Sequence, residues 1–392
     1  MTNTYIVSAV RTPIGSLLGS LSSLSFSELG SHALRAAVSR AAPLKPEQVD
    51  EIYFGNVLSA NIGQAPARQV SRGAGLPDSV IATTVNKVCA SGMKSVMLGA
   101  QTIQLNQAQI VACGGAESMS NVPHYLPGAR QGFKYGGGQI KDGIERDALS
   151  DAYTNTAMGI AGEDCAQQFG ITREEQDEFA VESYMRAQKA RDAGKFTTEI
   201  APVEITKRGK TTVVDADEEI GKFDPGRVSK ARPVFSKDGT ITAVSASKIN
   251  DGASALILAS EQMVQQLGLK PLAKIVGYAD AAQAPIKFPS SPALAVEKLL
   301  SQTKKSLADI DFFEFNEAFG VVGIANTRLL GRDPAKVNPY GGAVSLGHPV
   351  GCSGARIVTT LTSVLNQEGG KLGVAAICNG GGGASAMLIE RV

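Results

Sequence analysis

The chain repeats itself, and this repeat constrains its fold more than any other feature. Residues 51–56 resemble residues 311–316, and further along each copy Cys-Ala-Ser-Gly-Met-Lys at 89–94 parallels Gly-Cys-Ser-Gly-Ala-Arg at 351–356. In each copy, apolar residues at helical spacing then predict a helix, which a short apolar strand follows. The pattern predicts a duplicated α/β unit. The alternative is chance similarity between two βα units of any α/β protein.

Composition excludes several classes of protein. The chain has 392 residues, of which 43% are hydrophobic, and a net charge of +1, so it is too apolar and too weakly charged to be disordered. Its five cysteines are too few for a disulfide scaffold, and no apolar run approaches the ~18 residues of a membrane span. The near-neutral charge gives no electrostatic case for nucleic acid or an anionic membrane as a partner. No export or transit signal is visible, so we expect a cytoplasmic protein, or a mitochondrial one if a transit peptide preceded this sequence.

Charge is concentrated in one part of the chain. Residues 141–240 hold 35 of the 75 Asp, Glu, Lys and Arg residues. The sequence therefore predicts a weakly charged body interrupted by a charged, loop-rich insertion. Within this insertion Thr172 and Glu175 form a capping-box pair, an apolar stripe follows at helical spacing, and Gly194 ends the predicted helix.

Cys89 is the first candidate for chemistry. It follows a β-type run at 82–88 and directly precedes a predicted helix. The positive end of a helix dipole and the free N–H groups of the first turn lower the pKa of a thiol, which makes it a nucleophile. The alternative is a buried cysteine that acts as a small hydrophobic residue.

His348 and Cys378 also lie at glycine-rich turns. His348 is one of three histidines and lies within the glycine-rich segment 341–351, while Cys378 ends a predicted strand and precedes Asn-Gly-Gly-Gly-Gly at 379–383. A glycine turn there can present backbone N–H groups to an oxyanion, although most glycine clusters are only tight turns. Neither the cysteine spacing nor the histidines indicate a zinc site, and the glycine spacing does not fit a dinucleotide fingerprint. Two thiols and one imidazole suggest thiol acyl transfer, in which one thiolate carries the acyl group and a second acid/base handles a carbon acid.

Four motifs resemble those of the thiolase family, and the resemblance covers the whole chain from residue 10 to the last strand. Residues 86–94 resemble the nucleophile motif, 316–319 the oxyanion motif, 341–354 the histidine motif and 378–382 the second-cysteine motif. The resemblance implies an α/β thiolase fold: two duplicated βαβαβαββ halves in a five-layered α-β-α-β-α arrangement with an inserted loop domain. It implies these domains: an N-terminal half at 1–118 plus 249–268, a coenzyme A-binding loop domain at 119–248, and a C-terminal half at 269–392.

The resemblance also implies a mechanism. Cys89 attacks acetyl-CoA while His348 takes its proton, and Cys378 then removes a proton from a second acetyl-CoA, whose enolate attacks acetyl-Cys89 to give acetoacetyl-CoA. Thiolysis is the reverse reaction. Two oxyanion sites are implied, one from His348 and a water held by Asn316, the other from the N–H groups of Cys89 and Gly380. Such a reaction begins the synthesis of mevalonate and sterol precursors, or ends the breakdown of ketones and short-chain 3-ketoacyl-CoA.

The resemblance further implies ligands and partners. No covalently bound cofactor is expected, and coenzyme A is a substrate, with contacts from Tyr184, Lys222, Asp224, Arg227 and Ser247. For each of these the alternative is an ordinary surface residue. Some relatives bind potassium, and the matching residues here are Tyr184, Ala243, Val244, Ala246 and Val344. A homotetramer, built as a dimer of dimers, is expected.

Two other functions compete with a thiolase. A ketoacyl synthase of the same superfamily also condenses thioesters on a cysteine, but it uses two histidines, or histidine and asparagine, where this chain offers His348 and Cys378. A non-catalytic CoA-binding relative would not be expected to retain Cys89, Asn316, His348 and Cys378 together.

Overall fold

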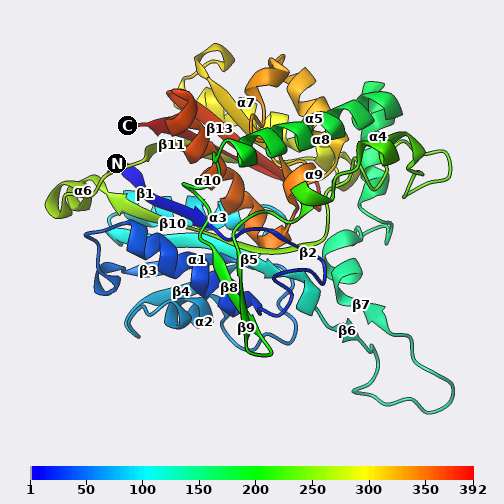
Figure 1. The fold of residues 1–392 in the computed structure, drawn as a ribbon, viewed down its shortest axis with the longest axis horizontal. Helices are drawn as coiled ribbons and strands as arrows, with labels where there is room; N and C mark the ends of the chain where they lie inside the picture. The colour runs from blue at the N-terminus through cyan, green and yellow to red at the C-terminus, as the bar shows by residue number, and fades with distance from the viewer. Residues whose placement is uncertain (1) are drawn as a thin grey trace.

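The computed structural model describes residues 2–392 and consists of two similar halves (Figure 1). The elements of the first half, in chain order, are β1 (Thr4–Arg11), α1 (Phe26–Arg40), β3 (Glu51–Gly55), α2 (Pro66–Gly73), β4 (Ile81–Val85), α3 (Ser91–Gln104), β5 (Ile110–Ser118) and β10 (Asn250–Ser260). Its strands lie side by side in the order β4-β3-β5-β10-β1, and the short strand β2 (Gly15–Ser16) pairs with β10. The first half therefore follows the predicted βαβαβαββ sequence.

The second half repeats this order with two differences: within residues 269–392 it lacks a strand equivalent to β4, and it has an additional short helix, α9. Its elements are β11 (Ala273–Ala282), α7 (Ser291–Thr303), β12 (Phe312–Phe315), α8 (Gly320–Leu329), α9 (Ala343–Leu346), α10 (Val350–Glu368), β13 (Leu372–Asn379) and β14 (Gly383–Arg391). The strand order is β12-β13-β14-β11, and the equivalent of β4 shrinks to a single bridge between Phe313 and Val337. Val337 lies between a 3₁₀ turn that starts at Pro334 and the left-handed Asn338 (φ +47°). The extended backbone therefore cannot continue beyond this residue in either direction.

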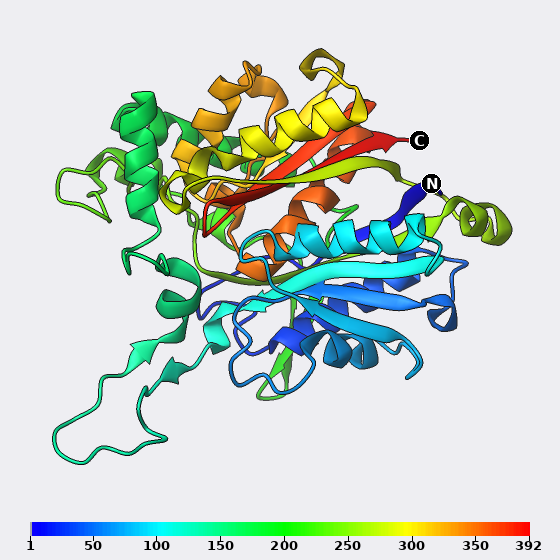
Figure 2. The same cartoon turned by 180° about the vertical axis from the view of Figure 1, so that it is seen from behind.

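The layers alternate as the resemblance implied. Helices α1 and α2 cover the outer face of the first sheet, α7 covers the outer face of the second with α8 beside it, and α3 and α10 lie between the two sheets (Figure 2). Each layer boundary has its own hydrophobic core, represented by Leu29 outside the first sheet, Met93 and Ile357 between the sheets, and Leu299 outside the second. The two sheets join where β1 pairs with β11.

The repeated Ser-Gly pair marks the place where the two central helices meet. A Cβ added at Gly92 of α3 would lie 2.7 Å from the backbone nitrogen of Ala355, and one added at Gly354 of α10 would overlap the backbone of Met93. Both positions must therefore be glycine for α3 and α10 to approach this closely. The second copy of the repeat thus has a packing role as well as a place in the histidine motif.

The segment between β5 and β10 lies outside the large sheet. It contains a hairpin of β6 (His124–Tyr125) and β7 (Lys141–Asp142), helices α4 (Gly159–Phe169) and α5 (Arg173–Asp192), and a hairpin of β8 (Val203–Lys207) and β9 (Lys210–Val214). Helix α5 begins with the predicted capping box and ends just before Gly194, whose φ is +69°. The β6–β7 hairpin extends away from the body as an arm (Figure 2). A short helix, α6 (Glu261–Leu267), leads into the second half.

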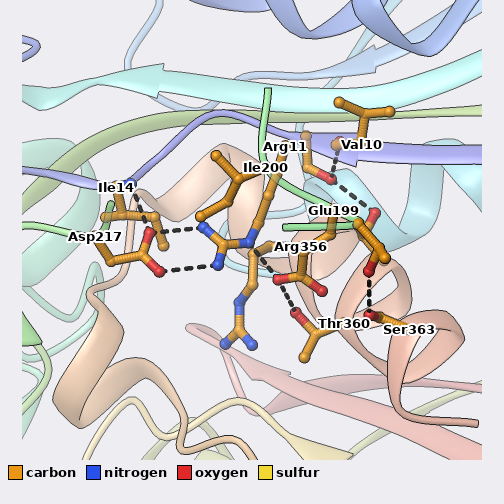
Figure 3. Close-up of polar contacts among 12 residues, drawn as sticks. Val10, Arg11, Ile14, Glu199, Ile200, Asp217, Arg356, Thr360 and Ser363 are labelled. Atoms are coloured by element: carbon orange, nitrogen blue, oxygen red, sulfur yellow. Dashed lines mark hydrogen bonds and ion pairs between the residues drawn. The ribbon is translucent and has the colours of Figure 1, made fainter. Parts of the chain in front are cut away.

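A buried ion cluster ties this segment to the first sheet (Figure 3). The guanidinium of Arg11, at the end of β1, contacts Glu199 through Nε at 2.5 Å and Asp217 through Nη1 and Nη2 at 2.6 and 2.8 Å. Asp217 also accepts the backbone N–H of Ile14 at 2.8 Å. Because all three charged side chains are buried, removing one of them would leave an uncompensated charge in the interior.

Candidate active site

Four predicted site residues meet at one end of the two halves. Cys89 lies just before α3, His348 lies just before α10, Asn316 follows β12, and Cys378 is the penultimate residue of β13. The amide Nδ2 of Asn316 lies 3.5 Å from Nε2 of His348, and the backbone N–H of Gly380 lies near enough to the Cys89 sulfur to act on the pKa of the thiol. The fold therefore brings together residues that are far apart in the sequence: Asn316 with His348, and Gly380 and Cys378 with Cys89.

A strained turn presents Cys89. Val88 has a φ of +49°, which is rare for a β-branched residue and costs free energy. Three hydrogen bonds hold this turn: the Val88 N–H donates to Asn86 Oδ1 at 3.0 Å, the Ser91 hydroxyl donates to the Val88 carbonyl at 2.6 Å, and the Lys87 N–H donates to Ser91 Oγ at 2.8 Å. The serine of the predicted nucleophile motif thus holds the backbone that carries the thiol.

The sequence predicted a lowered pKa for the Cys89 thiol, and this prediction is wrong for the protein without substrate. Burial raises the pKa of Cys89 to about 11, although the N–H of Gly380 and its own N–H act in the opposite direction. Desolvation by the surrounding core outweighs the helix dipole. Burial also raises the pKa of Cys378, and the neighbouring Cys89 adds to this effect. Both sulfurs are therefore thiols at neutral pH, and a base must accept a proton before Cys89 can attack.

His348 has the protonation state that such a base needs. Burial and the nearby Arg356 lower its pKa to about 3, so the imidazole is neutral at pH 7. Nδ1 lies 2.6 Å from Oγ of Ser353, whose hydroxyl donates to the carbonyl of Pro349 at 2.9 Å. We therefore assign the proton of the neutral ring to Nδ1, which leaves the lone pair on Nε2, the nitrogen that faces Asn316.

The histidine loop follows an unusual backbone path. Gly347 has a φ of +113°, and a Cβ there would lie 2.5 Å from the side chain of Asn250, whose Oδ1 accepts the His348 N–H at 2.9 Å. Glu117 accepts the N–H of Gly351 at 2.9 Å. Sequence reasoning missed Ser353, Asn250 and Glu117 as supports of this loop. Of these three residues, only Ser353 could have been found from the sequence, because it belongs to the repeated Ser-Gly pair.

The glycine turn after β13 passes over the thiol. A Cβ on Gly380 would lie 3.4 Å from Met158 and 3.7 Å from Val88, and the next residues, Gly381 and Gly382, have φ values of +84° and +88°. The left-handed backbone at these two glycines turns the chain so that the Gly380 N–H points at Cys89. This cluster is the predicted glycine-lined turn.

Asn316 has an unused acceptor. Its Oδ1 is buried and makes no hydrogen bond within residues 2–392, while its Nδ2 faces His348. A buried amide oxygen is costly to leave unpaired. The atom therefore fits the water-holding role that the sequence implies for Asn316.

A cavity of about 560 Å³ opens beside His348. Of the predicted coenzyme contacts, Lys222 and Ser247 line this cavity, and its other walls are largely apolar, with Met158 and Phe319 among them. The remaining predicted contacts are outside its lining. Tyr184 is buried in a stack with Phe223 (centroids 4.3 Å apart), and Asp224 and Arg227 pair with each other at 3.2 Å on an exposed turn.

The residues predicted for a monovalent cation lie near the same cavity. Ala243 and Ala246 line it, and Tyr184, Val244 and Val344 pack together in a small cluster. One cation is already present at this place, because the ammonium of Lys248 donates to the carbonyl of Ala246 at 2.6 Å. Burial lowers the pKa of Lys248 to about 8, and the carboxylate of Glu219 works against this shift.

Two thiols, a neutral imidazole and a backbone N–H near one of the thiols are groups that acyl transfer can use, and they lie on a duplicated α/β fold. Comparison with family models assigns the class: the thiolase N-terminal domain matches residues 4–262 and the thiolase C-terminal domain matches residues 269–391. The chain belongs to the thiolase family.

Particular relatives are similar over their full length. The acetyl-CoA acetyltransferase IA of Candida tropicalis is 58% identical over 99% of this chain and 97% of its own. A Gibberella zeae protein named acetyl-CoA acetyltransferase ERG10, cytosolic, is 54% identical over 99% of this chain and 98% of its own. The crystal structure of Acat5 thiolase from Ascaris suum in complex with coenzyme A superposes with a TM-score of 0.95 at 46% identity, with both chains fully covered.

Proposed function

We propose that this chain is an acetyl-CoA C-acetyltransferase, which condenses two acetyl-CoA into acetoacetyl-CoA and CoA and catalyses the reverse thiolysis. The observation that carries the proposal is a neutral imidazole at His348, beside Asn316, on a fold that also places the Cys89 thiol next to a second thiol, Cys378. The names of the full-length relatives support the substrate. The second thiol favours a thiolase over a ketoacyl synthase, and the intact set disfavours a non-catalytic CoA-binding protein.

In the first half-reaction Nε2 of His348 accepts the proton of the Cys89 thiol, and the thiolate attacks the acetyl carbonyl. The oxyanion that forms accepts hydrogen bonds from the N–H groups of Cys89 and Gly380, and each such donor contributes about 3–4 kcal/mol. Collapse breaks the bond to the coenzyme sulfur, which takes a proton from Cys378. The products are acetyl-Cys89, free CoA, an imidazolium at His348 and a thiolate at Cys378.

The second half-reaction uses the imidazolium of His348 and the thiolate of Cys378. The Cys378 thiolate removes a proton from the methyl carbon of a second acetyl-CoA, and the enolate oxygen is stabilised by the imidazolium and a water held by Asn316. The enolate carbon attacks acetyl-Cys89 and forms the new carbon–carbon bond. The departing Cys89 thiolate recovers its proton from His348, so every proton is accounted for and both thiols are regenerated.

The segment 119–248 is proposed as the coenzyme-binding loop domain, between the half at 1–118 plus 249–268 and the half at 269–392. Lys222 and Ser247, on the wall of the cavity beside His348, support this. Tyr184, Asp224 and Arg227 are proposed as further coenzyme contacts; the exposed guanidinium of Arg227 suits a phosphate group. The Ascaris suum relative, whose structure is a coenzyme A complex, supports the ligand class.

A homotetramer, arranged as a dimer of dimers, is proposed as the working form. Strand β4 is a sheet edge whose Ile81 is 62% exposed, and the arm between β6 and β7 exposes Leu126, Phe133 and Tyr135. Exposed edges and apolar arms are surfaces that other subunits cover. Light scattering on the purified protein tests this, since a monomer would overturn it.

A cytoplasmic location is proposed, with supply of acetoacetyl-CoA for mevalonate and sterol precursors as the role. The name of the Gibberella zeae relative supports it. Within residues 2–392 no helix has the length and hydropathy to cross a membrane. Imaging of the protein, tagged at its C-terminus and expressed from its own gene, separates this location from a mitochondrial role in ketone or short-chain breakdown.

One assay tests the reaction: coenzyme A-dependent loss of acetoacetyl-CoA, followed for the wild type and for Cys89→Ser and Cys378→Ala. We expect both variants to lose nearly all turnover. Near-wild-type turnover by Cys89→Ser would remove the nucleophile assignment. Efficient cleavage of 3-ketohexanoyl-CoA and longer chains would instead overturn the short-chain substrate.

A further inference from the structure

Lys248 lies where the sequence predicted a monovalent metal ion. It directly follows Ser247, and its Nζ donates to the Ala246 carbonyl at 2.6 Å. The same ammonium lies 5.9 Å from the centroid of the Tyr184 ring. Ala246 and Tyr184 are two of the five residues predicted to surround the ion.

A potassium ion does not fit beside this side chain. Such an ion would need the carbonyl oxygens of the loop as ligands, so it would have to share the oxygen of Ala246 with the ammonium that already donates to it. Two positive charges that contact the same oxygen would also lie close to each other, where their repulsion is strong. The negative group that lines the same wall is Glu219, and it can balance one cation.

We propose that the ammonium of Lys248 is a built-in cation that replaces potassium in holding the loop 242–247, so that this protein needs no alkali ion. As a statement about catalysis this rests on the proposed function. The positive charge of Lys248 and the lone pairs of the Ala246 carbonyl meet at the position where relatives that need potassium hold their ion.

The loop has a structural reason to need a cation. Its backbone is held to the start of α8 by the Ser247 N–H, which donates to the Ala318 carbonyl at 3.0 Å, and by the Gly320 N–H, which donates to the Ser245 carbonyl at 2.7 Å. Lys248 adds a hydrogen bond within the segment, to the carbonyl of Ala246, which lies between the two residues that contact the start of α8. Ser247 lines the cavity next to His348, so Lys248 acts as a positioning residue for the coenzyme site.

The wild type provides the first test. Its KM for CoA and its melting temperature are measured at constant ionic strength in potassium chloride and in N-methyl-D-glucamine chloride. We expect both quantities to be the same in the two salts. A KM that falls several-fold in potassium, or a melting temperature that rises with potassium alone, would overturn the proposal.

Two variants provide the second test. Lys248→Gly removes the ammonium and leaves room, so we expect the KM for CoA to rise about tenfold, as for one lost charge-assisted hydrogen bond. Potassium, but not N-methyl-D-glucamine, should restore the KM and raise the melting temperature of this variant, because an ion that binds only the folded state stabilises it. Lys248→Met keeps an apolar side chain of similar length in place but removes the charge and leaves no space for an ion. The raised KM of this variant should therefore not respond to potassium.

The outcomes separate this inference from the proposed function. Melting temperatures report ion binding without turnover. If the melting temperatures respond to potassium as expected but the protein cleaves no acetoacetyl-CoA, the proposed function is refuted and the built-in cation is still supported. A Lys248→Gly variant that is insensitive to potassium in both measurements would refute the cation, as would rescue of Lys248→Met. If Lys248→Gly does not fold, the wild type and Lys248→Met still decide.

Discussion

Replacing Ser353 with alanine should slow the chemistry without changing the fold. Oγ of Ser353 is the only partner, within residues 2–392, of the Nδ1 of His348, at 2.6 Å. In Ser353→Ala the buried Nδ1–H loses its acceptor, which costs about 1–3 kcal/mol. The ring can avoid this cost by moving its proton to Nε2, but that tautomer cannot accept the proton of Cys89. Either route raises the activation free energy by about 1–3 kcal/mol, which corresponds to roughly a 5- to 150-fold lower kcat.

Steady-state thiolysis with acetoacetyl-CoA and CoA both varied measures this effect. We expect kcat to fall while the KM for CoA changes little, because Ser353 does not line the coenzyme cavity. Thr362→Val is the matched control: Thr362 lies on the same helix and donates to the carbonyl four residues before it at 2.8 Å, as Ser353 does, but it has no contact with His348. A Ser353→Ala enzyme with kcat within about twofold of wild type, at an unchanged melting temperature, would refute the tautomer argument.

Three further predictions follow from individual polar contacts. Arg11→Ala leaves two buried carboxylates without their cation, so we expect a loss of about 3–5 kcal/mol in the free energy of unfolding, measured by urea denaturation, and a loss of under 1 kcal/mol would contradict the burial argument. Lys87 and Lys94 lower the pKa of Asp280 from 3.8 to about 2, and because a third of the side chain is exposed we halve the corresponding ~2 kcal/mol to about 1 kcal/mol. That stabilisation is fully present above pH 3.8 and is lost as pH falls through about 2. The melting temperatures of wild type and Asp280→Asn should therefore differ at pH 7 and converge in acid. A difference that stays constant with pH would count against this assignment. Asn316→Ala should lower kcat for condensation by about 10²–10³-fold if its amide holds an oxyanion-binding water, whereas an unchanged rate would remove that role.

The order of the strands and helices could be read from the sequence because its signals are local. Periodicity of apolar residues, the capping box at Thr172 and the glycine at 194 each depend on neighbours within a few residues, and the structure confirms the helix they predict. The repeat extended this reading to the whole fold, since two similar segments adopt similar structures. The two halves differ at Val337, where a proline turn and a left-handed asparagine reduce a strand to one bridge, and at the additional short helix α9.

The sequence by itself identified Cys89, Asn316, His348 and Cys378 as candidates, because each lies in a motif whose residue types match a chemical task. Only the tertiary structure decided their state. The pKa of Cys89 is raised because packing removes water from its sulfur, and packing depends on residues from both halves. The contacts of His348 with Ser353 and Asn316, and of Lys248 with Tyr184, likewise arise where separate segments meet. Composition and local pattern determine which elements form, whereas burial and charge depend on how those elements pack, so they were decided only in the folded chain.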